Sequence, residues 1–243
     1  MIKKISLIAM LFLSAIAYAQ PGDEDVVYFT DAKVKHSRFS IVLLGNPNYT
    51  DRRLINDEIP SGGGFDLPSE NADGGFQLNY NLDLMYSIGP SFDVGIGFGR
   101  STAYFEVNDI SYYQNRADTV NANLAVRTGM YTVPIKFNFN TTVTDLWDLE
   151  VVPGVELNFF NVYDQMITPD GEEEVKTDLS SLVESFNYSV NLSLGGTYKL
   201  SDSWGLVIRG NVRYLLKPII EESNFPRETI YNFGGNIGLK YDF

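Results

Sequence analysis

The chain has 243 residues, of which 31 are acidic and 18 basic, and it contains one histidine and no cysteine. A net charge of −13 argues against a nucleic-acid partner, because nucleic acid requires a basic surface. The lack of cysteine excludes disulfides, and the lone His36 argues against a zinc site or a histidine-dependent hydrolase.

Residues 1–19 have the pattern of a cleavable signal peptide. Lys3 and Lys4 precede an apolar run from Ile5 to Ile16, and Ala17-Tyr18-Ala19 supplies a small-x-small cleavage site. The run is too short to span a membrane as a helix, and no later stretch offers about 18 continuous apolar residues. We therefore predict an exported chain, with residues 20–37 as a short periplasmic segment and residues 38–243 as one β domain.

Strict alternation marks the β domain. In FQLNYNLDLMYSIG, from Phe76 to Gly89, the residues at every second position up to Ile88 are apolar or aromatic, while those between are mostly polar. A period of two indicates a strand with one apolar and one polar face. Eight segments carry the pattern: Arg38–Pro47, Gly75–Ile88, Phe92–Val107, Ala125–Val143, Leu149–Tyr163, Ser185–Leu200, Gly205–Lys217 and Thr229–Phe243.

The connections between these segments alternate between short and long, as they do in up-and-down membrane barrels. The polar rows hold mainly Asn, Gly, Ser and Gln, which suit a narrow barrel interior better than a face in water. We therefore predict an all-β fold: an eight-stranded antiparallel up-and-down transmembrane β-barrel in the outer membrane, surrounded by lipid and lipopolysaccharide. The alternative is a secreted lipocalin-like barrel, which has the same strand count.

The last strand, TIYNFGGNIGLKYDF, ends on an aromatic residue. Its predicted lipid-facing row includes Tyr241 and Phe243, and this ending resembles the signal that outer-membrane barrels present to their assembly machinery. Two prolines inside predicted strands, Pro134 and Pro153, lack the N–H that a closed sheet uses, so we expect a bulge at each.

The stretches YTVPIKFNFN and LEVVPGVELNFF resemble the small outer-membrane β-barrel proteins of Bacteroidetes that are grouped as PorT-like. The resemblance covers most of residues 38–243, with Pro134 and Gly154 at the positions of that family's proline-bearing arm and glycine-bearing strand. It implies the barrel fold, and a range of roles that includes secretion accessories and narrow channels.

Charged residues on the predicted inward rows form a candidate lumen cluster. Centring the turn of the fourth and fifth strands on Leu146 places Lys136 opposite Glu156, within reach of an ion pair. We predict a charged plug that either fills the lumen or gates a narrow pore, with Lys240 nearer the periplasmic end. The cluster comprises Asp83, Lys136, Glu156, Arg209 and Arg213.

The predicted function is a structural or accessory role in the envelope, including that of a subunit in a larger outer-membrane secretion or assembly complex. The alternative is a narrow channel for small solutes, gated by the lumen cluster. No enzyme activity, cofactor or metal is predicted. The acidic long loops favour solubility, or bind divalent cations that bridge lipopolysaccharide. The run Gly62-Gly63-Gly64 does not open a helix and is no phosphate cradle.

Overall fold

A computed structural model describes residues 38–54, 65–66, 72–115, 118–220 and 228–243. All described residues belong to one compact unit, which spans His36–Phe243. The predicted signal peptide, the segment 20–37 with His36, and Gly62-Gly63-Gly64 lie outside the described residues. Those expectations therefore stay predictions.

Eight long strands form this unit, and their order follows the chain. They are β1 (Phe39–Leu54), β3 (Ala72–Gly89), β4 (Phe92–Asn115), β5 (Asp118–Thr144), β6 (Trp147–Pro169), β8 (Phe186–Lys199), β9 (Trp204–Leu215) and β10 (Glu228–Asp242). Two short strands, β2 (Phe65–Asp66) and β7 (Val175–Asp178), add to β4 and β6, and a single 3-10 turn, η1 (Ser180–Leu182), follows β7.

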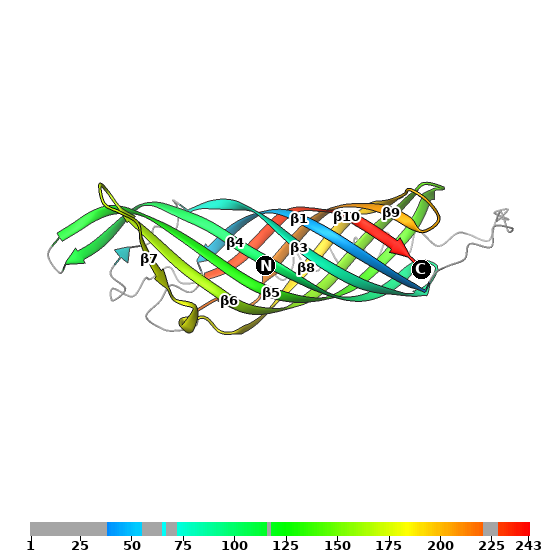
Figure 1. Ribbon diagram of the computed structural model, residues 1–243, viewed down its shortest axis with the longest axis horizontal. Helices are drawn as coiled ribbons and strands as arrows, with labels where there is room; N and C mark the ends of the chain where they lie inside the picture. The colour runs from blue at the N-terminus through cyan, green and yellow to red at the C-terminus, as the bar shows by residue number, and fades with distance from the viewer. Residues whose placement is uncertain (1–37, 55–64, 67–71, 116–117, 221–227) are drawn as a thin grey trace, which may run out of the picture. The chain divides into compact units, whose positions relative to one another are not determined.

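The long strands close into one antiparallel ring, as Figure 1 shows. Each strand pairs with its neighbours in sequence, and the ring closes where β1 pairs with β10 from Ser40↔Asp242 to Leu54↔Glu228. The predicted eight-stranded up-and-down barrel is therefore confirmed. One end of the barrel, here called the turn end, carries three short turns and Phe243, whereas the loop end carries three longer connections and the short one between β4 and β5.

The outer surface of the barrel carries a broad apolar belt. On β3 the outward row from Phe76 to Ile88 is exposed at every position, with Phe76 68% and Leu78 69% exposed. Twelve steps along a strand at ~3.4 Å each, tilted by about 40°, cover ~30 Å of barrel height, which matches the hydrocarbon core of a bilayer. Such a surface is stable only against lipid, so the fold is that of a transmembrane β-barrel.

Aromatic pairs mark both edges of this belt, as membrane interfaces require. At the turn end the pairs are Phe39–Tyr86, Phe92–Phe139, Trp147–Tyr198, Trp204–Tyr241 and Tyr241–Phe243. At the loop end they are Tyr49–Phe233, Phe98–Tyr131 and Phe159–Phe186.

The prolines inside the strands make gaps in the ladder without making bulges, so the bulge prediction is wrong. Pro134 faces a two-residue gap in the β4–β5 pairing, and Pro153 faces one in the β5–β6 pairing. Pro47 does the same between β1 and β10. The register is equal on both sides of each gap. A residue in an antiparallel sheet directs its N–H to one neighbour only, so a proline interrupts one ladder while it still pairs on the other side.

Beyond the belt, towards the loop end, the two faces of the sheet exchange character. On β4 the inward residues Ala103, Phe105 and Val107 are buried and apolar, whereas the outward Glu106 is exposed. The inward residues form an apolar core with residues from the connections: Ala103, Phe105, Val107, Ile110, Ala122, Leu124, Val126, Tyr163, Val183, Leu215, Ile219, Ile220 and Ile230. This half of the barrel therefore follows the rule for proteins in water.

This exchange corrects the predicted strand ends. The expected connection at residues 108–124 is largely strand, because β4 continues to Asn115 and β5 starts at Asp118. Likewise, β6 runs to Pro169 rather than ending at Tyr163. The alternation continues in these segments with reversed polarity, so a search for outward apolar rows stops too early.

Candidate functional site: the charged lumen

The polar lumen depends on glycines on β4 that leave room for larger side chains on β3. A Cβ at Gly97 would overlap Asp83 Oδ1, and one at Gly99 would lie 2.8 Å from Asn81 Cβ. Both distances are below those of real contacts, so only glycine fits. The inward row of β4 thus permits the inward row of β3 to carry a carboxylate and an amide.

Lys136 and Asp83 form the first ion pair of the lumen. Lys136 Nζ on β5 lies 2.6 Å from Asp83 Oδ2 on β3, and the two side chains are 10% and 2% exposed. Asp83 Oδ1 accepts a second bond, at 2.7 Å, from Asn81 Nδ2. Because burial of one unpaired charge is costly, this pair stabilises the lumen only while both partners are charged.

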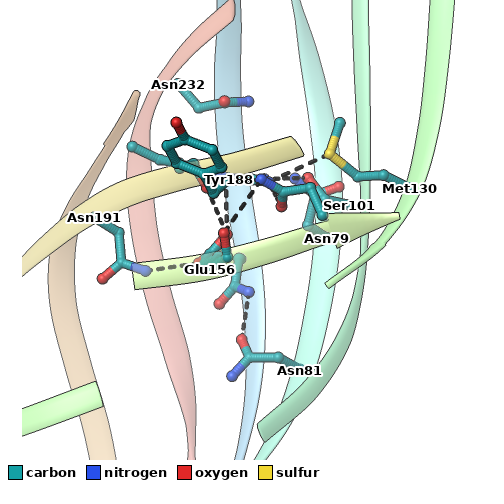
Figure 2. A network of polar contacts seen from close by, with 12 residues as sticks. Asn79, Asn81, Ser101, Met130, Glu156, Tyr188, Asn191 and Asn232 are labelled. Carbon is teal, nitrogen blue, oxygen red and sulfur yellow. Dashed lines mark hydrogen bonds and ion pairs between the residues drawn. The ribbon is translucent and has the colours of Figure 1, made fainter. Parts of the chain in front are cut away.

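Arg213 and Glu156 are at the centre of the second cluster. Arg213 Nε on β9 lies 2.8 Å from Glu156 Oε2 on β6. The remaining guanidinium nitrogens donate to Ser101 Oγ at 2.6 Å and to Asn158 Oδ1 at 2.6 Å. Figure 2 shows Glu156 between Asn191, whose Nδ2 donates to it at 2.7 Å, and the side where Ser101 lies. The arginine thus links β4, β6 and β9 across the lumen.

A third ion pair joins Arg209 to Glu150. Arg209 Nη2 and Nε lie 2.6 and 2.7 Å from Glu150 Oε2, and Thr197 Oγ1 donates to Oε1 at 2.9 Å. Glu150 is not a member of the predicted cluster, although it lies on the same inward row of β6 as Glu156, six residues earlier. Strand parity alone could have found it.

The structure brings the predicted cluster together with a different pairing. Lys136 lies opposite Gly154, and Glu156 lies opposite Pro134, so the expected Lys136–Glu156 opposition is wrong. The turn is the two-residue Asp145-Leu146, and one extra residue, Val143, stands between the pairs Thr142↔Asp148 and Thr144↔Trp147. This bulge shifts the register by one more residue than a simple hairpin would.

The Asp83 charge also fixes the orientation of a chain of amides. Because a carboxylate only accepts, Asn81 presents its Nδ2 to Asp83, and its Oδ1 accepts from Asn46 Nδ2 at 2.7 Å. Asn46 Oδ1 is therefore left without a hydrogen-bond donor. Asn48 directs its Nδ2 to Asn46 O, and its Oδ1 also has no donor. Two acceptor oxygens thus remain in the chain.

A small cavity lies beside this amide chain. Its volume is about 30 Å³, and its lining includes Asn46, Asn48, Asn81, Glu156 and Arg213. A volume of this size holds about two water molecules, which have polar partners here. The cavity is too small for a solute such as a sugar or an amino acid.

The lumen is therefore filled in two layers. The ion pairs and amides occupy the belt region, together with a small buried apolar cluster of Val42, Leu44, Met85 and Val207. The apolar core defined above occupies the loop end, where Phe105, Ile110 and Ile219 are fully buried. Any polar solute that passed through would have to cross this layer of buried, mostly apolar side chains, in which the Arg52 guanidinium lies 4.9 Å from the centre of the Phe105 ring.

Charged residues also lie at the turn end and beyond β6. At the turn end, Lys240 Nζ lies 3.2 Å from Asp242 Oδ1, and the buried Asp93 accepts bonds from Ser87, Asn138 and Asn140. Beyond β6, hydrogen bonds from the Ser180 hydroxyl and backbone N–H lower the pKa of the exposed Asp178.

Among the described residues, no group of three or more His, Cys, Asp or Glu side chains is placed to hold a metal ion. In the same residues there is no helix that is both long and apolar enough to cross a membrane. The predicted absence of a cofactor, and of divalent cations at the acidic loops, stays untested.

Neither a known family model nor a curated protein matches the chain by sequence. Among solved structures, Neisserial surface protein A is 10% identical at a TM-score of 0.41, over 85% of this chain and 98% of that chain. OprG from Pseudomonas aeruginosa is 13% identical at 0.40, over 86% and 97%. The outer membrane protease OmpT from Escherichia coli is 12% identical at 0.39, over 86% and 97%.

These likenesses are distant, and the assignment of the fold depends on the strand ring described above. A barrel fold by itself does not decide between catalysis, transport and binding. The expectations that the chain is not an enzyme and that it is PorT-like therefore stay predictions.

Proposed function

We propose that this chain is an integral outer-membrane protein with a structural or accessory role in the envelope, as a subunit of a larger secretion or assembly complex. The observation that supports this role is the double filling of the lumen. A polar layer held by three ion pairs is followed by an apolar core, so the interior gives the barrel rigidity and the outer surface is left for partners.

The orientation that fits this role places the turn end in the periplasm and the loop end outside the cell. Short turns on the periplasmic side and longer outer connections are typical of outer-membrane barrels. The exposed row that ends in Tyr241 and Phe243 supports recognition by the outer-membrane assembly machinery. The resemblance to PorT-like proteins supports the role in secretion or assembly.

Native purification tests the role as a subunit. An epitope inserted at Gly171 lies in an exposed turn with a φ of +79°, so it should disturb neither strand beside it. After extraction in mild detergent, we expect a particle much heavier than the barrel, with partners in fixed stoichiometry. The barrel purified alone, at any detergent concentration, would contradict the proposal.

Conductance distinguishes this role from the narrow channel that the sequence analysis keeps as its alternative. We expect planar bilayers that contain the purified barrel to show no steps above the lipid background. Discrete steps that change when Arg213 is replaced by Met would favour the channel, because Arg213 lines the cavity.

A further inference from the structure

Two arginines lie on the outer face of the barrel at the loop-end edge of the belt. Arg100 on β4 and Arg127 on β5 both belong to outward rows, and neither is buried. Neither forms an ion pair with any carboxylate of the described chain. The Arg100 guanidinium lies 5.9 Å from the centre of the Tyr131 ring.

The strand register places a pair of small residues, Thr102 and Gly129, between the two arginines, and this pair is here called the floor. Arg100 pairs with Tyr131, the next outward pair is Thr102 with Gly129, and the one after that is Tyr104 with Arg127. The middle pair carries one small side chain on β4 and none on β5, where Gly129 is buried beside the side chains of Val162 and Asn161 on β6. Arg100 and Tyr104 are four residues apart, ~14 Å along the strand, so the two guanidinium groups can approach the floor from opposite ends.

Two carboxylates that the strand register places beside Arg127 already have other partners. Asp164, which is opposite Arg127 on β6, is bonded to Lys176 Nζ at 2.9 Å. Glu106, two residues beyond Tyr104, accepts the hydroxyl of that tyrosine. The positive charge at the floor is therefore not neutralised by an ion pair, although Glu106, Asp164 and Glu174, whose charge also acts on Tyr104, lower the net potential around Arg127.

The height of the patch matches the level of lipid phosphates. Phe98 precedes Arg100 on the outward row and stacks on Tyr131, with 5.9 Å between the ring centres. Arg100 therefore lies where the aromatic edge of the belt meets the headgroups. At this depth a long basic side chain keeps its charge in the headgroup layer. Arginine also binds phosphate oxygens in bidentate fashion.

We propose that Arg100 and Arg127, with Thr102 and Gly129 between them, form a binding site for the phosphates of a glycolipid in the outer leaflet. The inference rests on the proposed outer-membrane placement, because it requires the loop end to face outside the cell. Their separation suits a headgroup with two phosphates, one at each arginine, and the tyrosines frame the sugar between them.

Native mass spectrometry of the full chain in detergent micelles tests the site. Three probes are compared: diphosphorylated lipid A, the same lipid without its phosphates, and inorganic phosphate. We expect wild-type protein to retain the diphosphorylated lipid and the R100Q/R127Q variant to bind it at least tenfold more weakly. The matched control is Lys217→Gln, because Lys217 also lies over a tyrosine but has Glu184 at 3.9 Å; it should bind like wild type.

Equal retention of the lipid by wild type and R100Q/R127Q would overturn the proposal. Equal retention of the dephosphorylated lipid would also do so, because acyl contacts with the belt would then suffice. Inorganic phosphate bound as tightly as the lipid would assign the patch to free phosphate instead. If the glutamine variant does not fold, judged by heat-modifiable gel migration, R100K/R127K replaces it. That variant keeps the charge and should bind more weakly than wild type, and binding equal to wild type would contradict a bidentate site.

Insertion into vesicles keeps the two proposals separate. A variant that inserts normally, as measured by protection from protease, but binds the lipid like wild type overturns the lipid site alone. A wild-type chain that does not insert at all overturns the membrane placement on which both proposals depend.

Discussion

Replacement of Lys136 by methionine tests whether the lumen is held by compensated charge. The change leaves the Asp83 carboxylate 2% exposed, with Asn81 as its remaining hydrogen-bond donor. Removing one partner of a buried pair costs about 3–5 kcal/mol of unfolding free energy. Both partners are nearly water-free, so little of that cost is screened by solvent.

The double variant D83N/K136M should be less destabilised than K136M alone. It contains neither charge, so the penalty of an uncompensated carboxylate disappears, and only a loss of about 1–2 kcal/mol for the weaker contacts remains. The coupling energy between the two sites is then ~3 kcal/mol or more, about a hundredfold in the unfolding equilibrium.

Urea titration of the barrel in phospholipid vesicles measures these free energies. Trp147 and Trp204 are exposed to lipid at the turn end, so their fluorescence reports loss of the barrel without a label. Effects of D83N and K136M that simply add in the double variant, within about 0.5 kcal/mol, would refute the coupling of the two charges. Additivity would mean that each side chain is stabilised by water rather than by its partner.

Three further predictions concern packing, pH and assembly. Gly97→Ala should lower the unfolding free energy by about 1–3 kcal/mol, because its Cβ would overlap an oxygen of the Asp83 carboxylate. Gly89→Ala is the control and should change the unfolding free energy little, because no atom lies within 4 Å of its Cβ. Equal effects of the two variants in urea titrations would refute this prediction. Hydrogen bonds from Ser180 lower the pKa of Asp178. They therefore stabilise β7 fully at pH values above the ordinary pKa of an aspartate, and this stabilisation is lost as the pH falls through the lowered pKa. An NMR titration should show that Ser180→Ala raises the pKa of Asp178, and an unchanged pKa would contradict the assigned cause. Deletion of Phe243, which is 63% exposed, should reduce the amount of barrel in the outer membrane without a comparable loss of stability in vitro, measured by membrane fractionation beside urea titration; unchanged membrane levels would remove its role as an assembly signal.

The barrel could be predicted because lipid imposes one simple rule on every strand. Each lipid-facing position in the belt must be apolar, so the rows through Phe76 and Phe233 appear directly as a period of two. The rule fails beyond the belt, where Phe105 and Val107 are apolar because they are inside. There the same alternation has the opposite meaning, and only knowledge of the water boundary would reveal it.

The members of the lumen cluster were predictable from strand parity, but their partners were not. Pairing depends on register, and register between β5 and β6 depends on the single extra residue Val143. A one-residue bulge leaves no signal in the alternation beside a turn where every residue is exposed. In the register that the short Asp145-Leu146 turn and the bulge set, Lys136 forms its ion pair with Asp83, and Glu156 forms its ion pair with Arg213.

The closure of the ring between β1 and β10 has a consequence for the order of folding. One edge of β1 stays unpaired until β10, about 190 residues later in the chain, pairs with it. Until then the growing sheet presents two unpaired edges and an apolar outer face, which favours aggregation. Contacts of such long sequence separation also slow folding. A chain that is cut short before β10 lacks the strand that pairs with β1, so quality control can act on a single event, the arrival of the final strand.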